Sequence, residues 1–259
     1  MTNTIKPILL LADSQLLFWK SDNSFLLQEL IDNVENKTPK AIYLGASNGD
    51  NPNYYEIFEA AMNNVGITQC KMLCSPYSND DQCALKEADL ILLAGGDVAT
   101  GWQAFEQARL SKTIQRRYYE GAQLIGVSAG AVQLGLGCFT PLNDEWLDTL
   151  ALVPCCIMTH EETNDWGSLH RAANVHQGGS CLGIPAGGGM LFYADHTVSP
   201  VRFPLIEIRS ENEESASFLL MDSQSGIIEH HAPEHNNALV KTVESNPLVN
   251  FNVNNKTLH

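Results

Sequence analysis

The sequence predicts an α/β fold in which a mostly parallel central sheet is covered on both faces, a three-layer sandwich. Two observations lead to this prediction. Strand-like apolar runs alternate with stretches of helical periodicity along the first half of the chain. Several of these runs, such as residues 8–12 and 90–94, are apolar throughout, as is typical of parallel strands that are buried on both faces. A third observation places the function: polar and glycine-rich loops follow several of the strands.

The predicted elements follow one another in a regular order. Strands are expected at residues 8–12, 41–44, 67–73, 90–94 and 123–125, and helices at 25–34, 54–65 and about 102–119. Gly45, the Gly95–Asp97 segment and Ser128 each follow a strand. Ligands of parallel sheets bind outside the carboxyl ends of the strands, so we expect these loops to share one rim.

The pattern changes after Cys138. A polar loop carries Asp144 and Glu145, a strand-like run at 155–158 ends at His160, and residues 180–199 look like a β-rich return. Short strands are expected at 205–208 and 218–221, before an Asn-rich tail at about 235–259. We therefore expect a main domain over residues 1–205 and a small β-rich extension and tail over 206–259, packed on the same domain.

Composition excludes several classes of function. The formal charge of −15 argues against a nucleic-acid partner, which needs a basic surface. Hydrophobic residues make up 44% of the chain, yet no apolar run approaches the roughly 20 residues of a membrane span. The N-terminal residues are expected to form a first strand and not a secretory signal. Seven cysteines, odd in number and without a Cys-x-x-Cys pair, indicate reduced thiols in a cytoplasmic protein.

The segment Gly126-Val127-Ser128-Ala129-Gly130 carries the strongest functional signal. It lies between an apolar strand and a helix-compatible stretch, which is the context in which Gly-x-Ser-x-Gly forms a nucleophile elbow. Such a turn raises the serine hydroxyl above the sheet, and the helix N-terminus beneath it favours negative charge. The alternative is a closely packed turn without catalytic function.

A nucleophilic serine needs a base that a third group orients. His160 is the best candidate base, because it follows a predicted strand on the same rim as Ser128. The orienting acid is expected between them, at Asp144 or Glu145. We favour Asp144, because Asn143-Asp144 is a turn-prone pair that can hold a short carboxylate rigidly.

Together these motifs resemble the serine peptidase family of dipeptidase E (aspartyl dipeptidase) and cyanophycinase, which has the class I glutamine amidotransferase-like fold. The resemblance covers roughly residues 5–200 and rests on Ala94-Gly95-Gly96-Asp97, the elbow and the strand-end histidine. It implies Ser128 as nucleophile, His160 as general base and Asp144 as its partner. It also implies that the backbone N–H groups of Gly96 and Ala129 stabilise the oxyanion.

The sequence departs from the family pattern in ways that bear on specificity. Asp97 stands where asparagine is common, and Glu161 stands where an aromatic residue often follows the histidine. Arg171 is the only guanidinium near the motifs, and it could bind a substrate carboxylate. Asp97, with Glu161 and Glu162, could instead favour a cationic substrate group. The sequence thus supports the hydrolase class better than aspartyl specificity.

Two other functions remain open at this point. In an α/β-hydrolase esterase the histidine lies near the C-terminus, which would make the base one of His230, His231 and His235. A non-catalytic binding protein of the amidotransferase-like fold is the second alternative. The expected substrate is a small peptide, with no cofactor and no metal, and a homodimer is possible. Neither a His-Glu-x-x-His motif nor a P-loop occurs.

Overall fold

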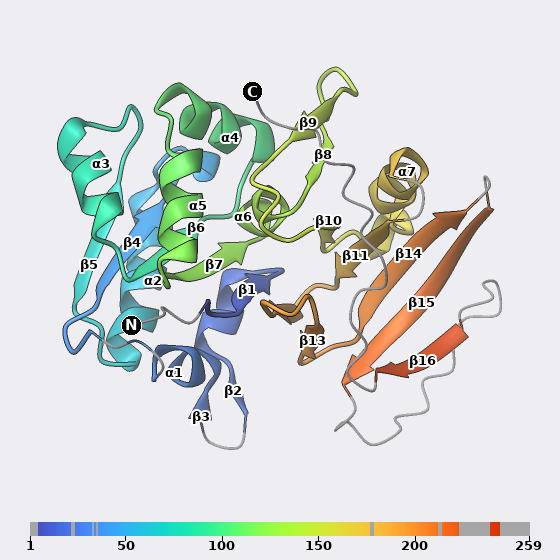
Figure 1. The fold of residues 1–259 in the computed structure, drawn as a ribbon, viewed down its shortest axis with the longest axis horizontal. Coiled ribbons are helices and arrows are strands. Elements are labelled where there is room, and N and C mark those ends of the chain that lie inside the picture. Colours follow the sequence, from blue (N-terminus) through green and yellow to red (C-terminus); the bar gives the residue numbers. More distant parts are fainter. Residues whose placement is uncertain are drawn as a thin grey trace.

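A computed structural model describes residues 5–21, 24–32, 34, 36–176, 179–211, 214–222 and 239–243. Its central sheet has seven strands in the order β13-β12-β1-β7-β6-β4-β5 (Figure 1). Five of them run parallel, namely β1 (Ile8–Leu11), β4 (Lys40–Leu44), β5 (Gln69–Leu73), β6 (Leu90–Leu93) and β7 (Gln123–Val127). The hairpin of β12 (Gly189–Phe192) and β13 (Val198–Val201) joins them antiparallel to β1. The mostly parallel central sheet of the prediction is confirmed.

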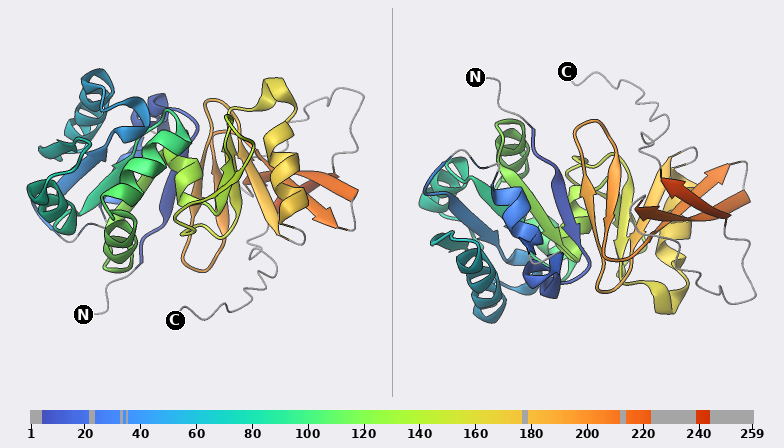
Figure 2. Two further views of the ribbon diagram at one scale, coloured as in Figure 1. Left: turned by 90° about the horizontal axis from the view of Figure 1, so that it is seen from above. Right: turned by 90° about the horizontal axis from the view of Figure 1, so that it is seen from below.

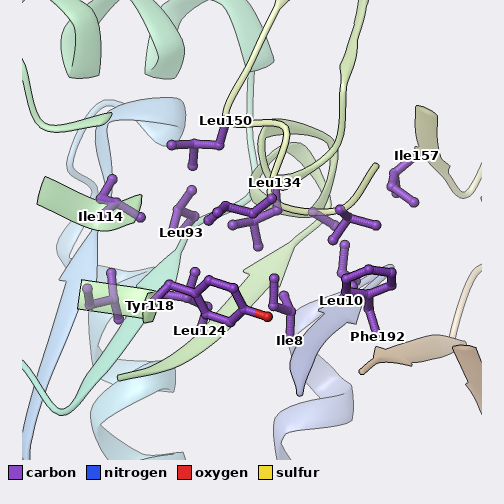
Figure 3. Close-up of a cluster of buried hydrophobic side chains, with 14 of the residues drawn as sticks. Ile8, Leu10, Leu93, Ile114, Tyr118, Leu124, Leu134, Leu150, Ile157 and Phe192 are labelled. Atoms are coloured by element: carbon purple, nitrogen blue, oxygen red, sulfur yellow. The ribbon is translucent and has the colours of Figure 1, made fainter. Parts of the chain in front are cut away.

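Side chains of each strand alternate between the two faces of this sheet. Leu9 and Leu11 of β1 pack with α1 (Leu26–Ile31) and α2 (Pro52–Asn64), whereas Ile8 and Leu10 pack on the opposite face. Figure 3 shows Ile8 and Leu10 with other buried side chains of that face. The helices on that face are α3 (Asn79–Lys86), α4 (Val98–Gln107), α5 (Ser111–Tyr119) and α6 (Ala129–Leu134). Among the described residues, no helix is both long and apolar enough to cross a bilayer.

Two features of the helices differ from the sequence-based prediction. The single helix expected over about 102–119 is two helices, α4 and α5, because the chain turns at Arg109 with a φ of 56°. Helix α3 was not predicted, although Ser78 and Asp81 form a capping box that fixes its start. Short 3-10 turns complete the loops at η1 (Ser14–Phe18), η2 (Ala46–Asn48) and η3 (Glu162–Asn164), beside a small hairpin of β2 (Lys20–Ser21) and β3 (Ser24–Phe25).

The second half of the chain builds a separate five-stranded sheet. Its strands are β10 (Cys156–Thr159), β11 (Ser180–Ile184), β14 (Leu205–Glu211), β15 (Glu214–Asp222) and β16 (Leu239–Val243). Helix α7 (Gly167–Val175) packs Leu169 and Ala173 against it. Ile157 and Leu182 lie in one buried cluster with Leu10, so the two sheets share a core. Figure 2 shows the two sheets side by side.

The predicted division at residue 205 falls at the start of β14. This strand pairs antiparallel with β11, so the second sheet continues across that position. The domain limits therefore remain a prediction. The Asn-rich tail expected at 235–259 lies outside the described residues, apart from β16.

Candidate active site

Ser128 lies on a sharp turn between β7 and α6. Its φ of 49° and ψ of −111° form a combination that a residue with a Cβ rarely adopts. The Ser128 N–H donates to the Leu11 carbonyl at 2.8 Å, and the Ser128 carbonyl accepts from Ala131 and Val132. These hydrogen bonds anchor the strained residue between a central strand and the first turn of a helix.

The glycines that flank Ser128 are required by close backbone packing. A Cβ at Gly130 would lie 2.0 Å from the Leu93 carbonyl oxygen, and one at Gly126 would lie 2.6 Å from the Gly130 carbonyl oxygen. Both distances are far below van der Waals contact with backbone atoms that cannot move away cheaply. The motif is therefore explained by packing of α6 against β6 and β7.

The structure brings His160 to Ser128. The His160 Nε2 and the Ser128 Oγ are 2.7 Å apart, within hydrogen-bond distance. The backbone N–H of His160 donates to the Ile184 carbonyl at 2.9 Å, and the φ of His160 is 45°. One expectation needs correction: β10, which precedes His160, belongs to the second sheet and not to the sheet of Ser128. The two side chains thus meet across the boundary between the sheets.

Two glutamates that follow His160 hold its loop. The Glu161 carboxylate accepts from the Ser168 N–H at 3.2 Å, beside the first turn of α7. The Glu162 carboxylate accepts from the Ala186 N–H in the loop after β11. These bonds tie the loop of His160 to two neighbouring elements through one oxygen of each carboxylate, whereas the Glu161 Oε2 is buried without a hydrogen-bond partner among the described residues.

Gly96 and Ala129 carry the two backbone amides that the resemblance implies as oxyanion donors. Ala129 is the first residue of α6, where the N–H has no acceptor within the helix. The Gly96 N–H makes no hydrogen bond to another described residue. Gly96 has a φ of 133°, and a Cβ there would lie 2.0 Å from the Ser47 carbonyl oxygen. The loop after β6, which carries Gly96, approaches the 3-10 turn η2, which carries Ser47, so closely that position 96 requires glycine.

Asp144, which the resemblance implies as the triad acid, pairs with a different residue in this structure. It lies in the loop between β8 (Gly137–Phe139) and β9 (Trp146–Asp148), where its carboxylate pairs with the Arg171 guanidinium. Within the described part of the chain, neither Asp144 nor Glu145 is hydrogen-bonded to His160; Glu145 instead accepts from the Asn143 side chain. The role of Asp144 as the triad acid stays a prediction, which this arrangement does not favour.

Arg171 and Asp97, the two predicted substrate contacts, both have partners within the protein. The Arg171 guanidinium lies 4.2 Å from the centroid of the Phe139 ring while it pairs with Asp144. The Asp97 carboxylate accepts from the Thr100 N–H at 2.7 Å and caps α4. The departure at Asp97 therefore has a structural explanation.

A pocket opens beside Ser128 and His160, and sequence reasoning did not identify most of its walls. Asp13 comes from the loop after β1, and Tyr54 and Phe58 come from one face of α2. Two signals were available: Asp13 follows the carboxyl end of a strand, and residues 54 and 58 are four apart on a helix.

Other predicted sites can be placed only in part. His230, His231 and His235, the bases of the esterase alternative, lie outside the described residues. Among the residues that are described, no group of three histidine, cysteine, aspartate or glutamate side chains is arranged to hold a metal ion.

Comparison with known proteins identifies relatives. The profile of Peptidase family S51 matches residues 8–200 of this chain. The uncharacterized peptidase YgaJ of Bacillus subtilis (strain 168) is 25% identical over 112 residues, which make up 43% of this chain. That match spans 49% of the relative, so the chain aligns with about half of its length. These findings confirm the predicted resemblance and support a serine-type peptidase.

Solved structures share the fold. A peptidase from an acI-B1 Actinobacterium superposes with a TM-score of 0.61 at 14% identity, covering 83% of this chain and 95% of that one. A candidate peptidase E protein from Listeria monocytogenes EGD-e gives 0.58 at 18% identity, covering 76% and 98%. At these identities the similarity concerns the fold alone, and it agrees with the predicted amidotransferase-like class.

Proposed function

Because this chain belongs to Peptidase family S51, we propose that it is a serine peptidase that hydrolyses small peptides through an acyl-enzyme. The observation that carries the proposal is the 2.7 Å contact between the Ser128 Oγ and the His160 Nε2 above a strained elbow. A hydroxyl in contact with an imidazole is the arrangement that activates serine as a nucleophile.

The proposed reaction uses this pair twice. His160 Nε2 takes the proton from the Ser128 hydroxyl as its Oγ attacks the peptide carbonyl carbon. The N–H groups of Gly96 and Ala129 then donate to the oxyanion, and His160 passes the proton to the leaving amine. Water, deprotonated by the same imidazole, attacks the resulting ester, and collapse of the second oxyanion releases the acid and Ser128.

Among the described residues, His160 makes no hydrogen bond or ion pair with a carboxylate. We infer that the imidazole is oriented chiefly by its loop, because Glu161 and Glu162 fix that loop and Asp144 is paired with Arg171. Asp144 can act as the acid only if its carboxylate comes within hydrogen-bond distance of His160, which it does not in this structure.

We also place the enzyme in the cytoplasm. All seven cysteines are free thiols in the structure, including Cys156 and Cys181, which face each other on neighbouring strands. Free thiols are typical of a reducing compartment.

A fluorophosphonate probe tests the proposal. It should label the wild-type protein and not Ser128→Ala, and a dipeptide library should be hydrolysed by the wild type alone. Absence of label on a folded wild-type protein would favour a binding protein. Turnover of esters without turnover of any peptide would favour an esterase.

A further inference from the structure

The pocket beside Ser128 has a volume of about 280 Å³. This is close to the lower end of the roughly 300–1,000 Å³ of typical ligand pockets, which suits one side chain rather than a long peptide. Ser128, His160, Gly95 and Gly96 are among the residues that line it. A substrate bound for attack by Ser128 therefore has this pocket directly beside its scissile bond.

Much of the pocket lining is apolar and aromatic. Leu17, Tyr43, Tyr54, Phe58 and Leu92 are among the residues that line it. The rings of Tyr43 and Phe58 pack with their centroids 5.5 Å apart, which gives a firm aromatic wall. Burial raises the pKa of Tyr43 to about 12, and its hydroxyl accepts a hydrogen bond from the Asn48 side chain, so this wall is uncharged at neutral pH.

The charged groups of the pocket are unsuited to an acidic substrate. No lysine or arginine is among the described residues that line it. Asp13 is the only carboxylate among the described lining residues, and both of its oxygens accept from backbone N–H groups, those of Gln15 at 3.0 Å and Gly187 at 2.8 Å. A substrate carboxylate here would lose water, find no lysine or arginine among the described lining residues and share the pocket with Asp13. Arg171, the predicted partner for such a carboxylate, is paired with Asp144 and does not line the pocket.

We propose that this pocket selects an apolar or aromatic side chain, such as that of leucine or phenylalanine, on the acyl side of the scissile bond and rejects aspartate and glutamate. The acyl side follows from Gly96, which lines the pocket and is also the proposed oxyanion donor. A carbonyl held at that amide carries the side chain of its own residue into the space beside it. This inference rests on the proposed function of Ser128.

Two phosphonate probes test the acyl side chain without a turnover assay. Diphenyl esters of aminoalkylphosphonates with a benzyl or a carboxymethyl side chain mimic phenylalanine and aspartate. The Ser128 Oγ forms a bond to phosphorus, one phosphorus–phenoxide bond breaks, and the proton taken by His160 leaves with phenol. We expect the benzyl probe to label Ser128 at least about 100-fold faster, because its ring fills the apolar pocket whereas a carboxylate loses water there without a lysine or arginine partner.

A matched pair of variants checks that the pocket causes the difference. Tyr54 is 49% exposed, so Tyr54→Arg introduces a cation at the pocket wall with little risk to folding. We expect it to reduce the benzyl-to-carboxymethyl ratio at least 10-fold. Tyr119→Arg, at an exposed tyrosine on α5 that does not line the pocket, should leave the ratio unchanged.

The outcomes separate this inference from the proposed function. Equal labelling by both probes, faster labelling by the carboxymethyl probe, or an unchanged ratio in folded Tyr54→Arg overturns the pocket assignment while Ser128 remains a nucleophile. Labelling by neither probe overturns the proposed function and the inference with it.

Discussion

The elbow of Ser128 and the hairpin loop of Asp144 illustrate two different ways in which a fold positions a side chain. Around Ser128 the strand is fully buried, and glycines allow backbone contacts that no other residue permits. Around Asp144 the chain is exposed, Leu142 is 95% accessible, and the main restraint on the carboxylate is one surface ion pair. Core packing therefore fixes the position of the nucleophile, whereas a surface ion pair only weakly restrains the position of the candidate acid. Substitutions in the two regions should differ greatly in their effects.

The largest expected effect on stability is at Gly130. Gly130→Ala places a Cβ against the backbone carbonyl of Leu93, so it should lower the free energy of unfolding by about 3 kcal/mol or more. Chemical denaturation measures this change. The matched control is Gly167→Ala at the start of α7, where the nearest atoms belong to the Asn164 side chain at 3.3 Å. If both variants lose the same stability, the close packing of the elbow is not what requires glycine.

A smaller effect is expected at Asp144. Asp144→Asn should lower kcat/KM less than 10-fold, because the carboxylate pairs with Arg171 and not with His160. Replacing the triad acid of a serine protease costs about 10⁴-fold, so the two roles are easily distinguished by steady-state kinetics. Arg171→Gln breaks the same ion pair and leaves the carboxylate in place, which makes it the matched control. A loss near 10⁴-fold in Asp144→Asn alone would restore Asp144 to the triad.

The ion pair between Asp144 and Arg171 should contribute least to the free energy of unfolding. The two side chains are 47% and 69% exposed, so solvent and salt weaken their attraction. We expect Asp144→Asn to change the free energy of unfolding by no more than about 1 kcal/mol, a difference that shrinks further at high salt. Thermal unfolding at low and high ionic strength measures it. A loss of several kcal/mol would mean that the hairpin depends on this pair and would weaken the contrast with the elbow.

Sequence reasoning succeeded where one local signal determines the structure. Strand-like runs identified all five parallel strands, and Gly126-x-Ser128-x-Gly130 identified the elbow, because steric limits at such a turn admit few other residues. His160 could be selected because it follows a strand end. These features depend on periodicity and backbone geometry, which are readable from neighbouring residues.

Sequence reasoning failed where the structure depends on contacts between residues that are far apart in the sequence. Nothing in the run at 155–158 distinguishes a strand of the central sheet from β10 of a second sheet, since the choice depends on its pairing with β11. The pairing of Asp144 with Arg171, 27 residues apart, likewise depends on how a hairpin and a helix come together. No glycine or proline lies between α4 and α5, so the local sequence does not indicate the break between them.

The proposed hydrolysis depends most directly on the pairing of Ser128 with His160, and a double-substitution experiment tests this pairing. Peptide hydrolysis should be measured for Ser128→Ala, His160→Ala and the double variant under single-turnover conditions. If the two side chains act as one unit, each single variant should lose about 10⁴-fold or more, and the double variant should lose no more than either. Losses that multiply in the double variant, or activity that survives in His160→Ala, would contradict the pairing.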